Sequence, residues 1–329
     1  MRIAPALGGI AATVLCFAAP APAPALAEEP PVHVMSWGSF GSTPGKFNLP
    51  SDAAVAANGD VFVADTQNNR VQRFDAEGTF ITAWGSLGDG NGQMSGPGAV
   101  AVDSQGDVYV TDTGNHRVQK FSGAGAFIAV WGGPGNGNGS FVDPTAIRVG
   151  PGDVVYVADT GNARVQRFNS DGQYLGQWGS AGTGDGQFSE MYGLAVDPSG
   201  NVFVSDATQA RVQKFSSTGT FLDAWGSPGS GDGQFLNPRG LATDGDGNVY
   251  VADMLNNRIQ KFAGDGGFLT KWGDYGSSEG EFNTPLGLTS DPEGRVYVSD
   301  TLNNRVQKFV PQPLQTFSSS WGRVKAVYR

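Results

Sequence analysis

The chain has few of the residues that most often bind zinc or activate a nucleophile. Its 329 residues include one cysteine, Cys16, and two histidines, His33 and His116. Zinc sites are built mainly from cysteine and histidine, so this chain cannot assemble a three-histidine or Cys/His catalytic site. A Ser-His-Asp triad would depend on His116 as the base, and in the repeat described below that position is otherwise filled by asparagine or alanine.

A long hydrophobic run is also missing, and the one short run lies at the N-terminus. Residues 1–27 carry a single charge, at Arg2, an apolar stretch over 7–19, and Ala25-Leu26-Ala27 before Glu28. This pattern is typical of a secretory signal peptide cleaved near Ala27/Glu28. Because the apolar stretch is shorter than the roughly 20 residues that span a bilayer, we expect no membrane span, and a retained anchor is the weaker alternative.

Removal of this segment has two consequences. The mature chain would be secreted or periplasmic, and it would contain no cysteine and therefore no disulfide. Lipidation at Cys16 is not expected, because the bulky Leu15 precedes it where a bacterial lipoprotein signal needs a small residue.

Positive charge is scarce as well. The formal net charge is −10, from 21 basic and 31 acidic residues, and loss of Arg2 with the signal leaves 20 basic residues and a charge of −11. An acidic surface repels a phosphate backbone, and no lysine or arginine cluster is interleaved with aromatic residues. Nucleic acid is therefore not an expected partner.

The chain does contain a sequence repeat of 47 residues, which occurs six times. Each copy has an aspartate followed five residues later by an arginine, at Asp65/Arg70, Asp112/Arg117, Asp159/Arg164, Asp206/Arg211, Asp253/Arg258 and Asp300/Arg305. A constant period indicates that each copy is one supersecondary unit, which acquires a core by stacking on its neighbours. Residues shared by all copies are expected to stabilise the fold, so function is sought where the copies differ.

Each copy reads as four short strands. In the copy over 236–273, the alternation and turn residues predict strands at 240–243, 248–253, 258–262 and 268–272. Four antiparallel strands repeated radially form a propeller blade. The sequence therefore predicts an all-β, six-bladed β-propeller in a single domain over 28–329, with small residues at the centre and large aromatics such as Tyr250, Phe262 and Trp272 between blades.

The repeat pattern is similar to a known family. Asp-Xaa-Xaa-Asn-Xaa-Arg-(Val/Ile)-Gln-(Lys/Arg)-Phe, followed by Trp-Gly and by Phe-Xaa-Xaa-Pro at the next copy, resembles the NHL repeat over about 31–322. The resemblance implies a six-bladed propeller in which the aspartate and arginine tie neighbouring blades together. That family includes bacterial sensor domains, RNA-binding domains and a metal-dependent amidating lyase, so the fold does not identify the function.

Ring closure has two candidates. Trp-Gly occurs seven times, but the other strands occur six times. Trp37 lies in phase, 47 residues before Trp84, whereas Trp321 lies 49 residues after Trp272. We therefore expect residues 32–37 to supply the fourth strand of the last blade, with the segment around Trp321 as the alternative.

Variation between the copies marks a candidate binding face. In a propeller, the connection into the first strand and the loop after the second strand emerge around one mouth of the central channel. The residue after the blade-opening proline varies there: Ser51, Gly98, Thr145, Tyr192, Arg239 and Leu286. Tyrosine and arginine on adjacent blades combine stacking with charge, which is a common recognition pairing.

The fourth copy departs furthest from the others. Met191 replaces a proline and Gln209 replaces an asparagine found in the five other copies. Together with Glu190, Tyr192 and Arg239, they predict a binding patch over the fourth and fifth blades. The alternative is drift at a tolerant loop.

Arg148 is a second outlier, because the other copies have alanine or threonine at its position. An arginine that points into the channel would attract an anion or pair with Asp52. It could equally turn toward a neighbouring blade.

The sequence favours a binding or interaction module for a protein, glycan or envelope ligand, monomeric and without a cofactor. The alternative is a metal-dependent lyase or lactone hydrolase that uses the channel, although the first strands offer only Asp52 as a ligand. Glycine-rich connections such as 88–92 resemble calcium-binding repeats, but they lack the stacked nine-residue period of those repeats. A purely structural propeller is a third possibility.

Overall fold

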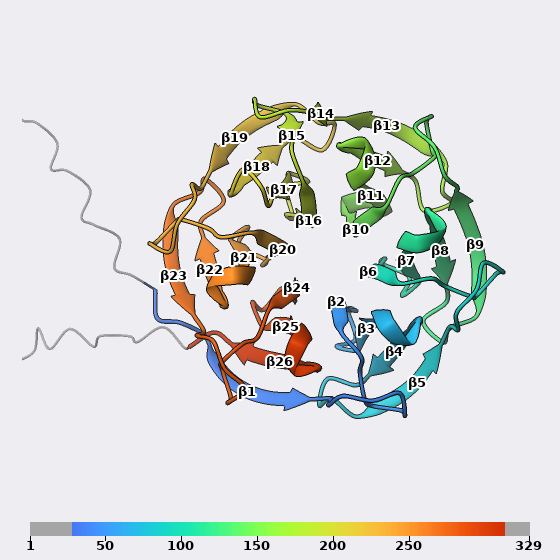
Figure 1. Ribbon diagram of the computed structural model, residues 1–329, viewed down its shortest axis with the longest axis horizontal. Helices are drawn as coiled ribbons and strands as arrows, with labels where there is room; N and C mark the ends of the chain where they lie inside the picture. The colour runs from blue at the N-terminus through green and yellow to red at the C-terminus, as the bar shows by residue number, and fades with distance from the viewer. Residues whose placement is uncertain (1–27, 313–329) are drawn as a thin grey trace, which may run out of the picture.

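The computed structural model describes residues 28–312, so the expected signal peptide and Trp321 lie outside the described residues. Six four-stranded antiparallel sheets are arranged as blades around a central channel (Figure 1). The predicted six-bladed all-β propeller is confirmed.

The first three blades comprise β2 (Pro50–Val55), β3 (Val61–Asp65), β4 (Arg70–Phe74) and β5 (Phe80–Trp84); β6 (Pro97–Val102), β7 (Val108–Asp112), β8 (Arg117–Phe121) and β9 (Phe127–Gly132); and β10 (Pro144–Gly150), β11 (Val154–Asp159), β12 (Arg164–Phe168) and β13 (Tyr174–Trp178). The fourth and fifth comprise β16 (Met191–Val196), β17 (Val202–Asp206), β18 (Arg211–Phe215) and β19 (Phe221–Trp225); and β20 (Pro238–Thr243), β21 (Val249–Asp253), β22 (Arg258–Phe262) and β23 (Phe268–Trp272). The sixth comprises β24 (Pro285–Ser290), β25 (Val296–Asp300), β26 (Arg305–Val310) and β1 (Val32–Trp37). Between the third and fourth blades, β14 (Ser180–Ala181) and β15 (Gln187–Phe188) form a short parallel pair.

Short 3₁₀ turns follow the second strand in every blade except the fourth. They are η1 (Thr66–Asn68), η2 (Thr113–Asn115), η4 (Thr160–Asn162), η5 (Met254–Asn256) and η6 (Thr301–Asn303). A further turn, η3 (Pro151–Asp153), lies in the first hairpin of the third blade. Among residues 28–312, no helix is long and apolar enough to cross a membrane.

The ring closes by pairing the two ends of the repeat array. Strand β1 pairs antiparallel with β26, with Val32 opposite Val310 and Trp37 opposite Val306. In Figure 1 the blue N-terminal strand completes the red sixth blade. Residues 32–37 therefore supply the fourth strand of the last blade, as predicted.

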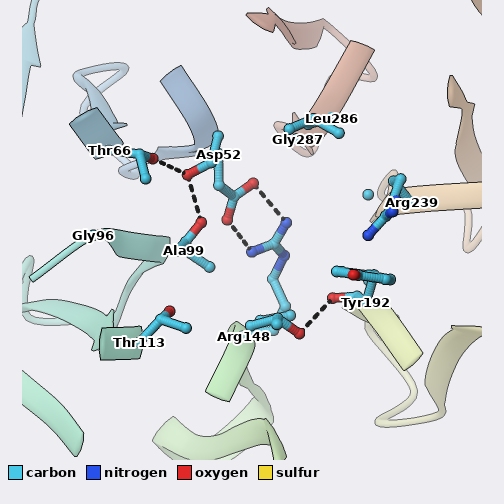
Figure 2. A pocket seen from close by; sticks show the side chains of 16 residues that line it. Asp52, Thr66, Gly96, Ala99, Thr113, Arg148, Tyr192, Arg239, Leu286 and Gly287 are labelled. Atoms are coloured by element: carbon cyan, nitrogen blue, oxygen red, sulfur yellow. Dashed lines mark hydrogen bonds and ion pairs between the residues drawn. The ribbon is translucent and has the colours of Figure 1, made fainter. Parts of the chain in front are cut away.

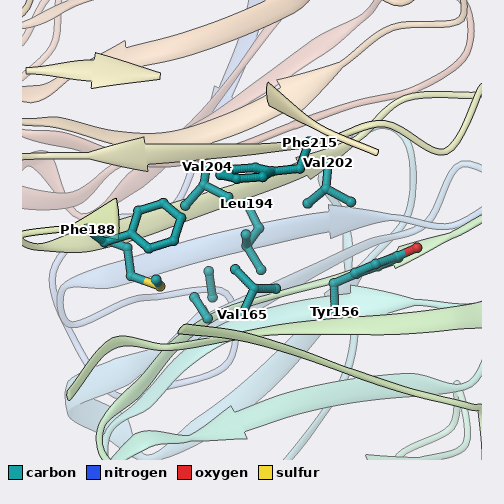
Figure 3. Packing of buried hydrophobic residues seen from close by; sticks show 10 residues of the cluster. Tyr156, Val165, Phe188, Leu194, Val202, Val204 and Phe215 are labelled. Carbon is teal, nitrogen blue, oxygen red and sulfur yellow. The ribbon is translucent and has the colours of Figure 1, made fainter. Parts of the chain in front are cut away.

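The core lies between adjacent blades. Between the third and fourth blades, Tyr156, Phe188 and Phe215 pack with Leu194 and five neighbouring valines and alanines (Figure 3). Trp178 covers this cluster from the fourth strand and lies against Gly219, where a Cβ atom would come within 2.6 Å of the indole ring. The predicted placement of aromatic side chains between blades is confirmed.

The repeated aspartate is the centre of a hydrogen-bond network. In the fifth blade, Asp253 is fully buried and accepts hydrogen bonds from Leu236 N (2.8 Å), Asn256 Nδ2 (2.8 Å), Arg258 Nε (2.8 Å) and Gln260 Nε2 (3.1 Å). The expectation that the ion pair itself bridges two blades was wrong. Asp253 ends β21 and Arg258 begins β22 directly opposite it, so both partners belong to one blade.

The arginine nevertheless links neighbouring blades through its other nitrogens. Arg258 Nη1 donates to Ser230 O (2.7 Å), and Arg258 Nη2 donates to Gly231 O (2.7 Å) and Gln234 O (3.0 Å). These carbonyls lie in the connection from the fourth blade. The guanidinium therefore holds the incoming chain against the blade that it enters.

The fourth blade lacks this ion pair. Asp206 instead accepts hydrogen bonds from the backbone N–H groups of Ser189, Glu190 and Gln209, at 3.0, 3.2 and 3.3 Å. Arg211 Nε is buried and has no acceptor within residues 28–312. The equivalent arginine and aspartate form a close pair in each of the other five blades, at 2.6–2.8 Å.

Candidate functional site

A cavity of about 240 Å³ opens at the mouth of the channel, on the face where the connections between blades emerge. Figure 2 shows that its lining comes mostly from the first strands, with Thr66 and Thr113 added by the turns η1 and η2. On the side of the first three blades the lining residues have small side chains: Gly98, Ala99, Thr145 and Ala146. On the other side stand the large side chains of Tyr192, Arg239 and Leu286.

Arg148 lies at the floor of this cavity and crosses the channel to Asp52. Its Nη1 donates to Asp52 Oδ2 at 2.8 Å and its Nη2 donates to Asp52 Oδ1 at 3.2 Å (Figure 2). The same two nitrogens donate to the carbonyl oxygens of Ile147 (2.8 Å) and Leu288 (2.9 Å). Arg148 therefore points into the channel and pairs with Asp52, and it does not turn toward a neighbouring blade.

The Asp52–Arg148 pair divides the channel. Below it lies a second cavity of about 160 Å³, lined by the first-strand alanines, such as Ala54 and Ala195, and by Arg148 itself. Asp52 is 5% exposed. Its burial raises the pKa of the carboxyl, and the charge of Arg148 offsets part of that rise. The cavity at the mouth therefore ends in a closed, internally paired floor.

Tyr192 and Arg239 form the most prominent wall of the cavity. The guanidinium carbon of Arg239 lies 3.2 Å from the centroid of the Tyr192 ring, which is a stacked cation–π contact. The Tyr192 hydroxyl donates to Glu190 Oε1 at 2.9 Å, and the Thr208 hydroxyl donates to Glu190 Oε2 at 2.8 Å. Glu190 thus orients Tyr192, which in turn supports Arg239.

The other residues predicted for the patch lie around the cavity, not in its lining. Met191 is 1% exposed and packs in the core between the third and fourth blades. Gln209 donates from Nε2 to Ser189 Oγ at 2.9 Å, in the loops above the fourth blade. Of the seven predicted residues, the cavity brings together Asp52, Arg148, Tyr192 and Arg239.

Two of the residues at the variable position, Ser51 and Thr145, have structural roles. Ser51 Oγ donates to Gly98 O at 2.6 Å, and the hydroxyls of Thr145 and Thr160 are hydrogen-bonded to each other at 2.6 Å. The prediction did not include Thr208, which holds Glu190. Its sequence signal was weak, since the equivalent positions carry Gln67, Gly114, Gly161, Leu255 and Leu302.

His116 also has a structural explanation. It has a left-handed backbone (φ 54°), and its Nδ1 accepts a hydrogen bond from Asp143 N at 3.1 Å. Asn69 at the equivalent position accepts one from Gly96 N at 2.9 Å in the same way. His116 therefore replaces an asparagine in a contact between blades.

Comparison with protein families identifies the repeat. The NHL repeat model matches residues 47–74, 94–121, 141–168, 235–262 and 282–309. The segment that would continue this spacing, 188–215, is not among the matched segments and belongs to the fourth blade. The blade that lacks the ion pair is thus also the one that departs from the family pattern.

Similar proteins support the fold and leave the activity open. The B-box type zinc finger protein ncl-1 of Caenorhabditis elegans and the protein brain tumor of Drosophila melanogaster are each 47% identical over 49 residues. Those 49 residues are 15% of this chain and only 6% and 5% of the two relatives.

Three solved structures resemble most of the chain. A protein of unknown function from Bacteroides thetaiotaomicron has a TM-score of 0.66 at 21% identity, covering 84% of this chain and 76% of that one. A gluconolactonase from Xanthomonas campestris has a TM-score of 0.61 at 15% identity, covering 88% and 99%. A streptogramin B lyase has a TM-score of 0.59 at 14% identity, covering 84% and 97%. At such identities the likeness concerns the fold alone.

Proposed function

We propose that this chain, a six-bladed β-propeller built of NHL repeats, is an extracytoplasmic binding module that receives part of a protein ligand at the channel mouth. One observation carries the proposal. The cavity at the mouth is open, and it is bounded by Tyr192 and Arg239 above a floor whose charges are already paired. A ligand can use this wall without breaking any contact that the ring needs.

The competing proposal is a metal-dependent lyase or lactone hydrolase, since two of the similar structures are named as a lyase and a gluconolactonase. The channel residues do not fit a metal centre. The Arg148 guanidinium occupies the channel and holds both oxygens of Asp52. Within residues 28–312, no group of three or more His, Cys, Asp or Glu side chains is placed to hold a metal ion. The donor set therefore supports recognition over metal chemistry.

The cellular location is part of the proposal and depends on residues 1–27, whose charge and apolar pattern are typical of a signal peptide. The acidic net charge disfavours nucleic acid. A monomer is proposed because the ring is closed by β1 and β26, which pairs the two ends of the array within one chain.

A capture experiment tests the proposal. The purified protein is immobilised and exposed to envelope and medium fractions, beside a variant with both Arg239→Ala and Tyr192→Ala. Lys271→Gln serves as the control, because Lys271 lies on β23 and its exposed ion pair with Asp232 is not part of the cavity. We expect the double variant to lose a specific partner that the control keeps, with the melting temperature unchanged. Equal capture by all three proteins would contradict a site at the mouth.

A metal analysis distinguishes the metal-dependent enzyme from the binding module. One equivalent of tightly bound zinc or calcium in the purified protein, lost together with an activity, would favour the enzyme. A metal-free protein that still captures its partner would favour recognition.

A further inference from the structure

We infer that the cavity at the mouth receives a carboxylate carried on a small aliphatic group, as at the C-terminal residue of a peptide. This inference rests on the proposed function and names the ligand chemistry of that site. Its support comes from the free hydrogen-bonding capacity of Arg239, the charges around it, and the size and lining of the cavity.

Arg239 differs from Arg148 in how its donors are used. Both Nη atoms of Arg148 are bound to Asp52 and to carbonyl oxygens. No residue within 28–312 accepts a hydrogen bond from the Arg239 guanidinium, and its Nε is buried without an acceptor. Stacking on Tyr192 occupies the face of the guanidinium and leaves its edge available. That edge matches the two oxygens of a carboxylate.

The nearby carboxylates of the protein are engaged elsewhere. Glu190 accepts hydrogen bonds from Tyr192 and Thr208, and Asp52 is bound to Arg148. Among the described residues, neither one nor any other carboxylate forms an ion pair with Arg239. In a chain with a net charge of −10, an arginine without a counter-charge at an open cavity is a site for an anion from outside.

The cavity limits the size of the attached group. Its volume of about 240 Å³ is below the ~300–1,000 Å³ of pockets that enclose drug-sized ligands. Ala99, Ala146 and Leu286 contribute apolar surface, and the paired floor prevents deeper entry. A single aliphatic residue fits this space better than a ligand of several residues.

The lining disfavours a sugar acid with the same charge. Arg239 covers one face of the Tyr192 ring, so a sugar ring cannot stack on that face. The hydroxyls of Ser51 and Thr145 are bonded within the ring of blades. Sugar hydroxyls would therefore lose water without gaining partners, which costs free energy. A carboxylate on an aliphatic body avoids this cost.

Calorimetric titration of the purified protein tests the inference with four probes. These are acetyl-Ala-Ala-Leu with a free carboxylate, the same peptide as its C-terminal amide, 4-methylpentanoate and glucuronate. We expect the peptide acid to bind about tenfold more tightly than the amide, which corresponds to ~1.4 kcal/mol. Tighter binding of the peptide acid than of 4-methylpentanoate would identify a peptide end as the source, and equal binding would identify a free carboxylic acid.

Variants of Arg239 locate the effect. Arg239→Gln should abolish the preference for acid over amide, Arg239→Lys should keep part of it, and Lys271→Gln should leave it unchanged. Equal affinity for acid and amide, or a preference for glucuronate, would overturn the inference. If a partner is still captured through Tyr192 and Arg239 but the peptide acid does not compete for it, the ligand chemistry is wrong and the proposed function stands. If the double variant captures the partner as well as wild type does, the proposed function itself fails.

Discussion

The fourth and fifth blades carry the same aspartate and arginine at the same spacing, yet they use them differently. In the fifth blade, Asp253 binds Arg258 directly. In the fourth blade, Asp206 turns to the backbone of the loop that carries Glu190, and Arg211 Nε is left without an acceptor among the described residues. A repeated pair of residues therefore does not guarantee a repeated interaction.

The comparison also shows which neighbouring residue matters. In three blades an asparagine, at 69, 257 or 304, can accept a hydrogen bond from the connection that enters the next blade. The connections that enter the fourth and fifth blades lack this acceptor, since Ala163 and Ala210 replace the asparagine. The fifth blade keeps its ion pair in spite of Ala210, so this alanine is not a sufficient cause. What distinguishes the fourth blade is Gln209, which binds Ser189 Oγ where Asn256 binds Asp253, and the replacement of proline by Met191.

The largest expected effect comes from removing the aspartate in each blade. Asp253→Ala leaves Arg258 without its buried carboxylate and should lower the free energy of unfolding by about 3–5 kcal/mol. Asp206→Ala removes only acceptors for backbone N–H groups near the surface and should cost about 1 kcal/mol. Urea titration of the two variants measures the difference.

Arg258→Lys and Arg211→Lys are the matched controls. The first should lower stability more than the second, because only Arg258 uses Nε in the ion pair. Equal losses in the two blades would show that the fourth blade forms the same pair in solution.

The central pair should give the next largest effect. Arg148→Met keeps an unbranched aliphatic stem and leaves Asp52 buried without its cation. Because the Arg148 side chain is partly exposed to the cavities, we expect a loss of only about 2 kcal/mol, below that for a fully buried pair. The double variant with Asp52→Asn should recover part of it, as measured by a double-mutant cycle. A cycle with no coupling would contradict the cross-channel pair.

A smaller effect is expected from returning Gln209 to the residue used in the other blades. Gln209→Asn should let the side chain reach Asp206, turn that carboxylate toward Arg211 and raise the free energy of unfolding by ~0.5–1 kcal/mol. Thermal unfolding measures the gain. If the variant is no more stable, Met191 or the conformation of Glu190 controls the loop.

The sequence predicted the ring because its period is constant, and it predicted closure by residues 32–37 because Trp37 is in phase. It could not predict the fate of Asp206, since that depends on side-chain reach within a loop. It left open whether Arg148 would pair with Asp52, because the two are 96 residues apart and meet only across the channel. The sequence placed Tyr192 and Arg239 at equivalent positions of adjacent blades, but it did not predict that the two side chains stack on each other. The support of Tyr192 by Glu190 and Thr208 likewise required the loop geometry.

The smallest expected effect is a pH dependence of the channel floor, which separates the buried Asp52 from surface carboxylates. Burial raises the pKa of Asp52 above its usual 3.8. Between 3.8 and the raised value, the folded protein keeps a proton that the unfolded chain has lost, so the contribution of Asp52 to stability falls as pH rises through that window and is level above it. The free energy of unfolding is measured from pH ~3 to ~8 for wild type and for Asp52→Asn. The difference between the two isolates the contribution of Asp52, because the contributions of the other carboxylates are the same in both proteins and cancel. A difference that rises with pH would mean that Arg148 holds the carboxylate ionised despite its burial.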